Sequence, residues 1–582
     1  MSLATLVSAL HSRPALINAL TIDSLILFFR LITHLKPRLS WHRASSFPGP
    51  PLFLPLDISR FLSSILQVDF STVSTMWSLF QDLAWSYAPS DRSMGGDLVD
   101  LLQHGLPFDV VFYNLYPPTR TCLDPRCVYV RTGRTGEPQE LTHLTWIRVV
   151  YFSREFGPVP GLSFSASCRR CNTRYYPAFY IHEHATSRTY YQGVPSTIHA
   201  ATHAYIETSL CNRFTNSMVC AWVSGTNNGR IYNLEHRDVQ GRFPQAWSIA
   251  PALSTTLVWD AFFLLALLRE HSEQGAHLEL RNKGELAERL KPALHARNLS
   301  MVGPGRENWN HACDKCCAHV EKDDIMRAAV MDGVTIDRPC CKVRDCKRPL
   351  PSQRARFCDF HASMDSLCVV VGCEAAAGDG FKTCSEVSHR DLEDLSSSAG
   401  TDAAGSCPSK SDEGNSRPRA RFGRRRTHNE QLCVATCGVM LARATFYGSE
   451  GLNGAATFLR IAFPTPKSLP ASLSFDNACS FQKHVQKKGD HHFDGIAMPV
   501  DVFHMKTKHK ETDEFCGQHC NPAMFPDLIV NGRWRFNTSA AEMTNAWIGG
   551  FGAIVREMRP DRYDFFLDEM IKQRNRMIVD DL

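Results

Sequence analysis

A ligand pattern of cysteine and histidine occurs twice in succession between residues 341 and 389, and it constrains the fold of this chain more than any other feature. The first copy is Cys-x4-Cys followed by Cys-x2-His, and the second is Cys-x4-Cys followed by Cys-x4-His. Thiolate and imidazole ligands suit Zn²⁺, and four of them complete the tetrahedron of a structural site. The sequence therefore predicts two structural zinc sites. Their ligands are Cys341, Cys346, Cys358, His361, Cys368, Cys373, Cys384 and His389.

The spacing leaves the pairing of these ligands open. Sequential sites, one for each copy, are the simplest arrangement, but a cross-braced arrangement uses the same residues. Cys340 could also replace its neighbour Cys341. The alternative to metal sites is a set of buried free cysteines, which are common core residues. The repetition in register argues against that alternative.

Another cysteine pattern lies in a part of the chain that is rich in β-branched and aromatic residues. Cys122-x4-Cys127 is followed about forty residues later by Cys168-x2-Cys171. Two short-spaced cysteine pairs on either side of strands are typical of a Cys₄ zinc ribbon, with ordinary buried cysteines as the alternative. About three structural Zn²⁺ ions are therefore expected. The pair Cys313-x2-Cys316 has no evident partner ligands and stays unassigned.

Composition favours an intracellular protein made of several domains. The 582 residues are 43% hydrophobic and 21% charged, which is typical of globular proteins, and the net charge of +5 is too small to indicate nucleic-acid binding by itself. The 22 cysteines cluster with histidines at metal-ligand spacing rather than following a secretory signal. The apolar stretch Leu253–Leu268 is short and contains Asp260, so a buried helix is expected rather than a membrane span.

The expected fold class is α+β and multidomain. A helical region comes first, then a zinc-ribbon-like β region, then the tandem Cys₃His cluster, which is inserted in or precedes an RNase H-like α/β core. Residues 393–430 are small and polar and predict a disordered linker, which ends in the basic run Arg417–Arg426. That run fits a nuclear import signal or a phosphate-contacting strap, with a solvated charged linker as the alternative. The predicted boundaries are 1–110, 111–300, 301–392, 393–430 and 431–582.

The C-terminal block contains acidic residues on elements that suit metal-dependent phosphoryl transfer. We expect a strand over Val434–Thr445, a helix over Gly454–Ala462, a short strand that ends at Asp476, a strand over 496–503, and a helix after Ser539 that carries Glu542. Two Mg²⁺ or Mn²⁺ ions that clamp a phosphodiester require carboxylate ligands. A strand-end aspartate followed by a helical glutamate is the order of an RNase H-like nuclease or transposase. Solvated or capping acids are the alternative.

The C-terminal 150 residues resemble the catalytic half of the KDZ transposases, which pair a DDE core with variable cysteine clusters. The resemblance rests on SLSFDNAC (472–479), VDVFHMKTKHKETDEFC (500–516) and WRFNTSAAEMTNAWIGGFGAIVREM (534–558). The tandem cluster and the ribbon-bearing part, about 110 to 270, are similar to cysteine clusters associated with this family. Together these segments cover well over half of the chain.

The resemblance implies three catalytic acids and a nucleic-acid partner. Asp476 corresponds to the second acid and Glu542 to the third, and Asp332 in Met331-Asp-Gly is the best candidate for the first. Asp332-Gly333 also fits a tight turn ahead of the zinc ligands. The implied cofactor is Mg²⁺ or Mn²⁺, the implied partner is DNA, with chromatin as a further one, and the implied location is the nucleus. The resemblance is also compatible with a homo-oligomer.

Two features leave further alternatives open. The group His504, His509, Cys516 and Cys520 fits another zinc site or simple surface histidines. For the function, the first hypothesis is a DNA transposase that cleaves and joins phosphodiesters. The second is a zinc-dependent DNA- or chromatin-binding relative that no longer cuts. The third is a cross-braced module that recruits a ubiquitin-conjugating enzyme or reads histone tails, and its ligand order departs from the usual ones.

Overall fold

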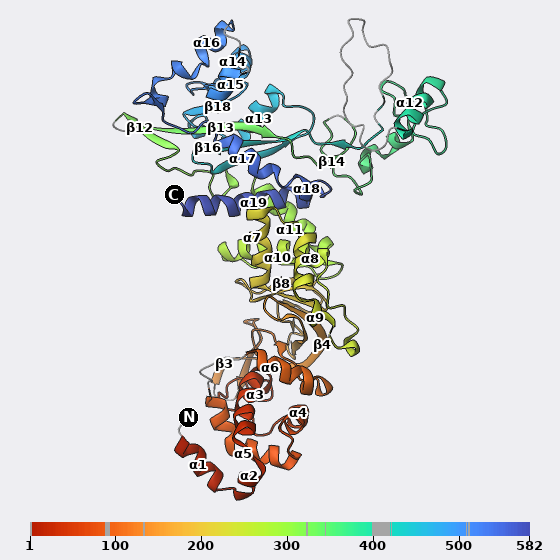
Figure 1. The fold of residues 1–582 in the computed structure, drawn as a ribbon, viewed down its shortest axis with the longest axis vertical. Coiled ribbons are helices and arrows are strands. Elements are labelled where there is room, and N and C mark those ends of the chain that lie inside the picture. The colour runs from red at the N-terminus through yellow and green to blue at the C-terminus, as the bar shows by residue number, and fades with distance from the viewer. Residues whose placement is uncertain are drawn as a thin grey trace. The chain divides into compact units, whose positions relative to one another are not determined.

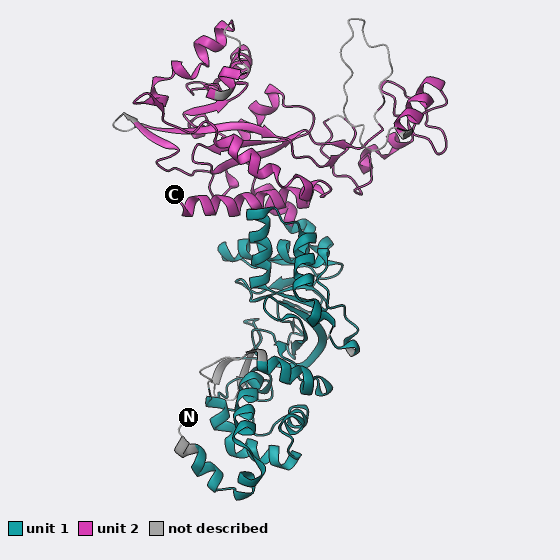
Figure 2. Ribbon diagram, in the orientation of Figure 1, with its two compact units in different colours: residues 1–293 teal, residues 294–582 magenta. Residues whose placement is uncertain are grey.

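The structure is a computed structural model in which the chain forms two compact units, Met1–Ala293 and Leu294–Leu582 (Figure 2). The structure describes residues 3–87, 94–131, 134–241, 243–321, 324–343, 345–398, 420, 422–507, 509 and 512–582. Most of the predicted linker, 399–419, therefore lies outside the described residues, as do Arg417, Arg419 and Arg421 of the basic run. Each unit has its own core and is described by itself.

The first unit begins with a helical bundle, as the sequence predicts for residues 1–110. Asp69 caps one of its helices by accepting a hydrogen bond from Thr72 N. Phe28, Phe61 and Phe80 are fully buried where three of the helices meet. The helices are α1 (Leu3–His11), α2 (Pro14–Ala19), α3 (Ile22–Ser40), α4 (Leu56–Leu66), α5 (Phe70–Ser86), α6 (Met94–Asp100), a π-helical turn at Leu101–Gly105 and a 3₁₀ turn at Leu106–Phe108.

A nine-stranded sheet follows the bundle, with the strand order β11-β8-β7-β6-β5-β4-β10-β9 and β1 paired to β5. Its centre is the long antiparallel pair β4–β5, in which Ser153 faces Gly157 at the turn. The strands are β1 (Tyr113–Leu115), β4 (Leu141–Ser153), β5 (Gly157–Cys168), β6 (Arg174–Tyr175), β7 (Phe179–Ile181), β8 (Ser187–Tyr190), β9 (Thr197–Ala201), β10 (Ala204–Glu207) and β11 (Glu279–Arg281); β2 (Val128–Arg131) and β3 (Arg134–Pro138) form a separate pair.

Helix α10 (Thr255–Glu273) is the predicted apolar helix over 253–268, and it is buried as expected. Residues 261–268 are buried without a break, and Asp260 is 5% exposed. In the part of the chain that the structure describes, no helix combines the length and the apolar character that a membrane crossing requires. The neighbouring helices are α7 (Thr208–Ala221), α8 (Gly225–Glu235), α9 (Arg237–Gly241) and α11 (Leu286–Ser300).

The second unit is built on a five-stranded sheet with the order β12-β13-β16-β17 and β18 on the free side of β13. Strand β13 pairs antiparallel with β16 and parallel with β18. Ala497 forms an isolated parallel bridge with Ser472, so the chain around Ala497 lies next to β18. The strands are β12 (Cys317–Glu321), β13 (Asp324–Val334), β16 (Asn429–Ala435), β17 (Met440–Phe446) and β18 (Ser472–Phe475).

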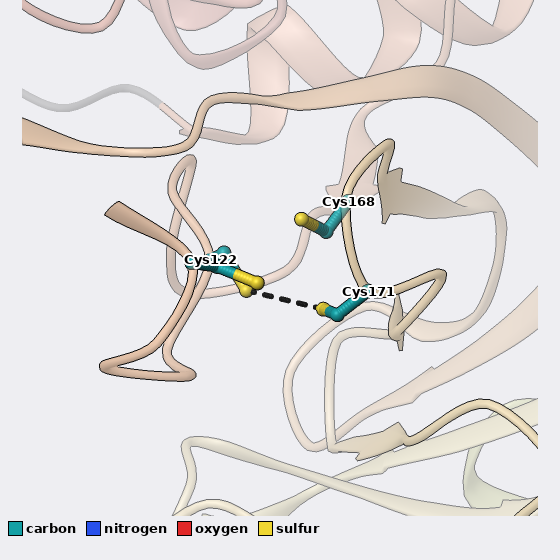
Figure 3. Close-up of side chains that lie close together, drawn as sticks. Cys122, Cys168 and Cys171 are labelled. Atoms are coloured by element: carbon teal, nitrogen blue, oxygen red, sulfur yellow. Dashed lines mark hydrogen bonds between the residues drawn. The ribbon is translucent and has the colours of Figure 1, made fainter. Parts of the chain in front are cut away.

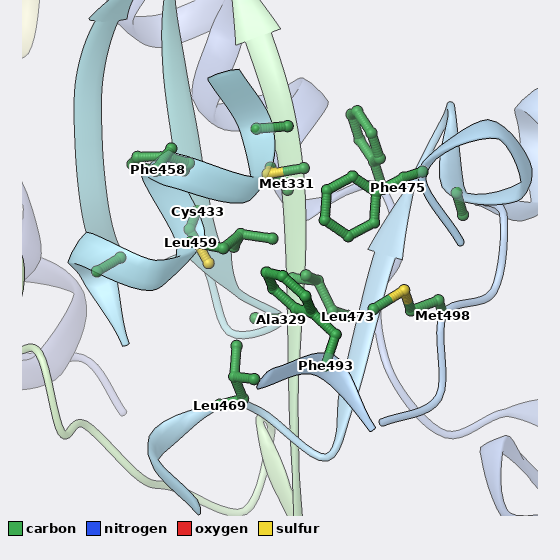
Figure 4. Packing of buried hydrophobic residues seen from close by; sticks show 14 of the residues in the cluster. Ala329, Met331, Cys433, Phe458, Leu459, Leu469, Leu473, Phe475, Phe493 and Met498 are labelled. Carbon is green, nitrogen blue, oxygen red and sulfur yellow. The ribbon is translucent and has the colours of Figure 1, made fainter. Parts of the chain in front are cut away.

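Helices cover both faces of this sheet, and the alternation of side chains along β13 and β18 assigns the faces (Figure 1). Met331 and Phe475 point into the core beneath α13 (Leu452–Ala462) and α14 (Ala478–Lys487), as Figure 4 shows. Asp332 and Asp476 therefore belong to the opposite face, against which α17 (Ala540–Gly549) packs. Other helices are α15 (Val502–Thr507), α16 (Glu514–His519), α18 (Gly552–Val555) and α19 (Pro560–Asp580).

The tandem cluster is an insertion between two strands that lie side by side. Strand β13 ends at Val334, which pairs with Glu430 of β16, so the intervening chain leaves the sheet and returns to it. The insertion leaves on a short stem in which β14 (Pro339–Cys340) pairs with β15 (Arg425–Arg426). The sequence predicted a core that starts at residue 431. The sheet also contains β12, which pairs with β13, and β13, whose partner β16 follows about a hundred residues later, so of the two arrangements expected for the cluster the structure has the inserted one.

Three local predictions differ from the structure. The expected strand Val434–Thr445 is a hairpin, because Gly438 adopts φ +97° in a turn that ends β16 and starts β17. The expected strand over 496–503 gives way to helix α15 after Asp501. The ends of the predicted linker are ordered, since residues 393–398 complete α12 (Val387–Ser398) and residues 425–426 form β15.

The last helix, α19, is held against the sheet by charged side chains that have lost contact with water. Arg443 of β17 donates to Asp568 Oδ1 at 2.9 Å and to Glu430 Oε2 at 2.5 Å, and Arg306 donates to Asp568 Oδ1 at 2.6 Å. Tyr563 OH donates to Glu430 Oε1 at 2.9 Å. Burial opposes ionisation of Asp568, but the two guanidinium groups outweigh it and hold its pKa well below the usual range.

Removing the charge of Asp568 should destabilise the second unit strongly. In Asp568→Asn, Arg306 and Arg443 stay buried without the carboxylate that they share, although Arg443 keeps Glu430, and breaking such a buried pair costs about 3–5 kcal/mol. Hydrogen exchange of the β16–β17 peptides at pH 7 in the full chain measures the loss of protection. Asp580→Asn, at the exposed end of the same helix, is the control and should exchange like wild type. Equal protection in both variants would contradict the role of the network.

Candidate metal centres and acidic site

Four cysteines of the first unit meet at one end of the β4–β5 pair. Cys122 and Cys127 lie on the loop that leads to β2, and Cys168 and Cys171 lie at the end of β5 and in the turn after it. Their sulfur atoms are within 4.8 Å of one another, and Cys122 Sγ lies 3.6 Å from Cys171 Sγ (Figure 3). Two cysteine pairs from two loops thus form one tetrahedral ligand set, which fits zinc binding.

The hydrogen bonding of these thiols also suits a metal site. Burial raises the pKa of Cys122 to about 11. Burial also opposes ionisation of Cys171, but hydrogen bonding with Thr173 and with the neighbouring thiols lowers its pKa to about 7. Binding of Zn²⁺ displaces the thiol protons, and the positive charge of the ion then balances the negative charge of the buried thiolates.

The tandem cluster forms two separate sites, one for each copy of the repeat. Cys341, Cys346, Cys358 and His361 make the first ligand set, and Cys368, Cys373, Cys384 and His389 make the second. The ligand atoms are 3.2 Å apart for Cys384 and His389 and 3.4 Å apart for Cys358 and His361. The sequential pairing is therefore the one in the structure, and the cross-braced alternative is not. Cys340 lies in β14 and does not replace Cys341.

Two more groups of this kind lie in the second unit. The unassigned pair Cys313 and Cys316 meets His311 and Cys437. His509 and Cys516 meet Cys479, rather than the proposed partners His504 and Cys520. The sequence did not identify His311, Cys437 or Cys479 as ligands, because none of them belongs to a repeat. Two of them reach the other ligands only through the packing of strands and helices that are distant in the sequence.

The acidic residues Asp332 and Asp476 lie next to each other at the ends of neighbouring parallel strands. The register of the two strands pairs Met331 with Phe475, and each aspartate is the next residue in the chain. Gly333 continues β13 and pairs with Gln431, so Asp332-Gly333 is part of a strand and not the tight turn that we considered. A β-carbon on Gly333 would lie 2.2 Å from Asn429 Nδ2, which explains why glycine follows the aspartate.

Donors and charges surround the carboxylate of Asp332. Gly333 N donates to Oδ1 at 2.8 Å, and Asn545 Nδ2 of α17 donates to Oδ2 at 2.7 Å. Burial raises the pKa of Asp332 to about 6, the Gly333 hydrogen bond opposes this rise, and the carboxylates of Asp476 and Glu450 add to it. Three acidic groups therefore share this pocket, and Glu450 is one that no sequence signal indicated.

Glu542 approaches the same place from α17, one helical turn before Asn545. Its Oε1 lies 3.9 Å from Nδ1 of His504, and its side chain is 41% exposed. His504 also contacts Asp501. It is close enough to Asp332 to offset part of the rise in the pKa of Asp332. Asp332 and Glu542 thus each lie near His504, Asp476 adjoins Asp332 on the neighbouring strand, and the catalytic roles of these three acids stay a prediction.

The predicted basic run is engaged in protein contacts at its three described arginines. Arg424 pairs with Glu557 at 2.9 Å, and Arg426 pairs with Asp337 at 2.7 Å. Arg425 donates to the carbonyl oxygen of Val343 at 2.7 Å. All three arginines thus contact other parts of the unit, while Arg424 is also exposed to solvent.

Comparison with known families matches the two cysteine-bearing parts of the chain. Residues 110–236 match the CxC5 like cysteine cluster associated with KDZ transposases, and residues 330–395 match the CxC6 like cysteine cluster associated with KDZ transposases. The first match contains the four-cysteine group, and the second contains both Cys₃His groups. No curated protein and no solved structure matches the chain.

The sequential pairing predicts that each half of the tandem cluster depends on its own zinc. Cys346→Ser should lose one Zn²⁺ and expose residues 339–366 to hydrogen exchange, while residues 367–398 stay protected, because a structural zinc site contributes on the order of 10 kcal/mol to folding. Elemental analysis and exchange of the same full-length preparation measure both effects. Cys340→Ser, at the cysteine beside Cys341, should retain wild-type zinc. Loss of protection in both halves of Cys346→Ser would favour cross-bracing instead.

The raised pKa of Asp332 predicts a pH-dependent cost in stability when Mg²⁺ is absent. The folded protein holds this proton more tightly than an unfolded chain, whose aspartate has a pKa of about 3.9. The resulting stabilisation is complete below about pH 4 and is lost as the pH rises through 6. Asp332→Asn should therefore be more stable than wild type by about 1–2 kcal/mol at pH 8, and by about half as much at pH 5.

Thermal unfolding of both proteins at the two pH values, in buffer without Mg²⁺, tests this expectation. Asp527→Asn, at an exposed aspartate outside the pocket, should melt like wild type at both pH values. A difference between Asp332→Asn and wild type that is the same at pH 5 and pH 8 would contradict the assignment.

Proposed function

We propose that this protein, which its two cysteine clusters relate to the KDZ transposases, cleaves and joins DNA phosphodiester bonds at a site formed by Asp332, Asp476 and Glu542. The family relationship suggests DNA binding. The proposal adds to it a reaction class, a set of residues and a divalent-metal requirement.

One observation carries the proposal: an aspartate near the end of β13 and another directly after β18 belong to adjacent parallel strands, on the face against which a glutamate-bearing helix packs. The register that pairs Met331 with Phe475 brings Asp332 and Asp476 together, and α17 carries Glu542 to the same face. This is the arrangement expected of an RNase H-like DDE core, in which carboxylates far apart in the sequence serve one site. Packing on a sheet and a helix also gives such a site a rigid base.

The oxygen ligands of this pocket fit Mg²⁺ or Mn²⁺ better than zinc. Asp332, Asp476, Glu542 and the nearby Glu450 offer hard carboxylate oxygens and no thiolate. Burial raises the pKa of Asp332, and repulsion from Asp476 and Glu450 adds to the rise; a bound cation would oppose both effects. Two such cations, held about 3.5–4 Å apart, would stabilise the attacking and leaving oxygens of an in-line displacement.

The surroundings of Asp332 raise its pKa but leave the acid available as an anion near neutral pH. At pH 7 to 8, Asp332 is mostly ionised because its pKa is about 6. Water would replace the 3′-oxygen at phosphorus in the cleavage step, and the released 3′-hydroxyl would replace an oxygen of the target phosphodiester in the joining step. His504, beside Glu542, is positioned to contact a phosphate oxygen at the edge of this site.

The zinc-binding parts would supply contacts to DNA or chromatin, and the site of action would be the nucleus. Both Cys₃His groups stand on the β14–β15 stem between two strands of the core sheet. A module in that position can contact a nucleic acid without altering the strand register that aligns the acids.

One observation favours the alternative of an inactive DNA- or chromatin-binding relative. Both carboxylate oxygens of Asp332 accept hydrogen bonds from protein donors, Gly333 N and Asn545 Nδ2. A cation at Asp332 would have to displace the Asn545 amide. If this bond persists when DNA binds, the pocket is a neutralised acidic cluster, and the zinc modules alone carry the function.

Metal-dependent nicking of supercoiled plasmid DNA tests the proposal. Full-length protein with filled zinc sites should nick plasmid when Mg²⁺ or Mn²⁺ is added, and Asp476→Asn should lose at least about 100-fold of this activity, since changes beyond the direct ligands already cost about 10–100-fold. Asp527→Asn should nick like wild type. A chelator such as EDTA is unsuitable as the control, because it would also remove zinc from the cysteine groups.

The outcomes separate the two functions. Nicking that requires Mg²⁺ or Mn²⁺ and disappears in Asp476→Asn supports a transposase-type enzyme. DNA binding by wild type without nicking under any divalent cation supports the inactive relative. Nicking that survives in both Asp476→Asn and Asp332→Asn would overturn the assignment of the site.

A further inference from the structure

Four potential ligands meet at the end of the core sheet that lies away from the acids. His311, Cys313, Cys316 and Cys437 each bring one ligand atom within 4.8 Å of the others. The first three lie on the segment that leads into β12, and Cys437 lies in the turn between β16 and β17. The group is therefore composed of two segments that are more than a hundred residues apart in the sequence.

The backbone around each ligand is fixed by hydrogen bonds within the protein. Cys316 N and Cys317 N both donate to the carbonyl oxygen of Cys313, at 3.1 and 2.8 Å, and Cys313 N donates to Cys316 Sγ at 3.4 Å. An N–H group directed at a sulfur atom stabilises the thiolate form that binds metals. Across the group, Thr436 Oγ1 donates to Lys315 O at 2.9 Å and so holds the two segments together.

The histidine of this group has a buried nitrogen atom that the described protein does not satisfy. Nε2 of His311 is inaccessible to water and has no hydrogen-bond partner among the described residues. A buried polar atom without a partner costs free energy, and native structures rarely contain one without a reason. A metal ion coordinated by the imidazole would remove this cost.

Two simpler explanations of the cysteines are less adequate. Cys316 is fully buried in the main core of the unit, so packing alone could explain that residue. Packing does not explain why a histidine with an unsatisfied nitrogen joins three sulfur atoms. A disulfide does not explain them either, because Cys313 and Cys316 are free thiols whose sulfur atoms are 3.6 Å apart.

We infer that His311, Cys313, Cys316 and Cys437 form a closed structural zinc site of the core, separate from the cysteine clusters that the family comparison identifies. Four nitrogen and sulfur ligands leave no open position, so the expected role is to join the lead-in to β12 to the β16–β17 turn. Cys316 O accepts a hydrogen bond from Ala328 N in β13, four residues before Asp332. At about 3.3 Å per residue, that end of the strand is some 13 Å from the acid.

Zinc content of paired variants tests this inference. Cys437→Ser should lose one Zn²⁺ per chain relative to wild type by elemental analysis. Cys433→Ser, at the buried cysteine of β16 four residues earlier, and Cys317→Ser, at the residue beside Cys316, should retain the wild-type content. Retained zinc in Cys437→Ser, or equal loss in Cys317→Ser, would overturn the inference.

A pair of substitutions at His311 covers the case in which Cys437→Ser does not fold. His311→Cys keeps four ligands and should retain the zinc ion, whereas His311→Ala should lose it. With Co²⁺ in place of Zn²⁺, the absorption spectrum of wild type minus that of His311→Ala should show the visible bands of a tetrahedral site with thiolate ligands. Equal metal content in His311→Cys and His311→Ala would overturn the inference, whatever the result of the plasmid-nicking assay.

Discussion

Strand β13 forms backbone hydrogen bonds on both of its sides, and the organisation of the second unit depends on this double pairing. On one side, the antiparallel ladder with β16 sets where the inserted cluster leaves and rejoins the sheet. On the other side, the parallel ladder with β18 brings Asp332 beside Asp476. If β13 shifted by one residue in either ladder, Asp332 would face the apolar core that Met331 now occupies. Burial of Met331 therefore fixes the register that the acidic site requires.

The unit accommodates buried carboxylates in two different ways. Asp568 has two arginines within hydrogen-bonding distance, and its pKa is depressed, so it serves as a permanent anion that holds α19 to the sheet. Burial raises the pKa of Asp332, nearby acids add to the rise, and the two donors to its carboxylate, Gly333 N and Asn545 Nδ2, are neutral. In the first arrangement the arginines balance the carboxylate, whereas in the second the ionised form of Asp332 is disfavoured, which a bound cation would relieve. This contrast is the physical reason to assign a structural role to one and a functional role to the other.

The sequence predicted the ligand groups whose members lie close together in the chain. Cys358-x2-His361 and Cys168-x2-Cys171 are local patterns, and the in-register repeat strengthened the prediction for the tandem cluster. Groups whose last ligand arrives through strand pairing could not be predicted. Cys437 reaches Cys313 only because β16 pairs with β13, and that pairing is interrupted in the sequence by the whole insertion.

Prediction of the acidic site followed the same rule. The strand end at Asp476 and the helix start near Glu542 were visible locally, while the environment of Asp332 was not. Taken alone, the dipeptide Asp332-Gly333 is compatible with a turn. In the structure, Gly333 pairs with β16, and the close approach of Asn429 leaves no room for a side chain at this position. Glu450 and Asn545 follow from the packing of a loop and a helix on this strand, for which a single sequence carries no periodic signal.

The two kinds of candidate metal site at β13 differ in their ligands, and they lie near opposite ends of that strand. Thiolate and imidazole ligands lie at the start of β13, near Cys316, and carboxylates lie at its end, near Asp332. Soft ligands select zinc and hard oxygen ligands suit Mg²⁺ or Mn²⁺, so neither ion would compete effectively for the other's site. Because the tandem cluster has only a small apolar core around Val370, we expect its folding to depend on zinc, whereas the sheet that carries Asp332 and Asp476 has a large core of its own. A chain of this design could therefore lose cleavage by a change in one carboxylate and still retain every zinc-bound surface.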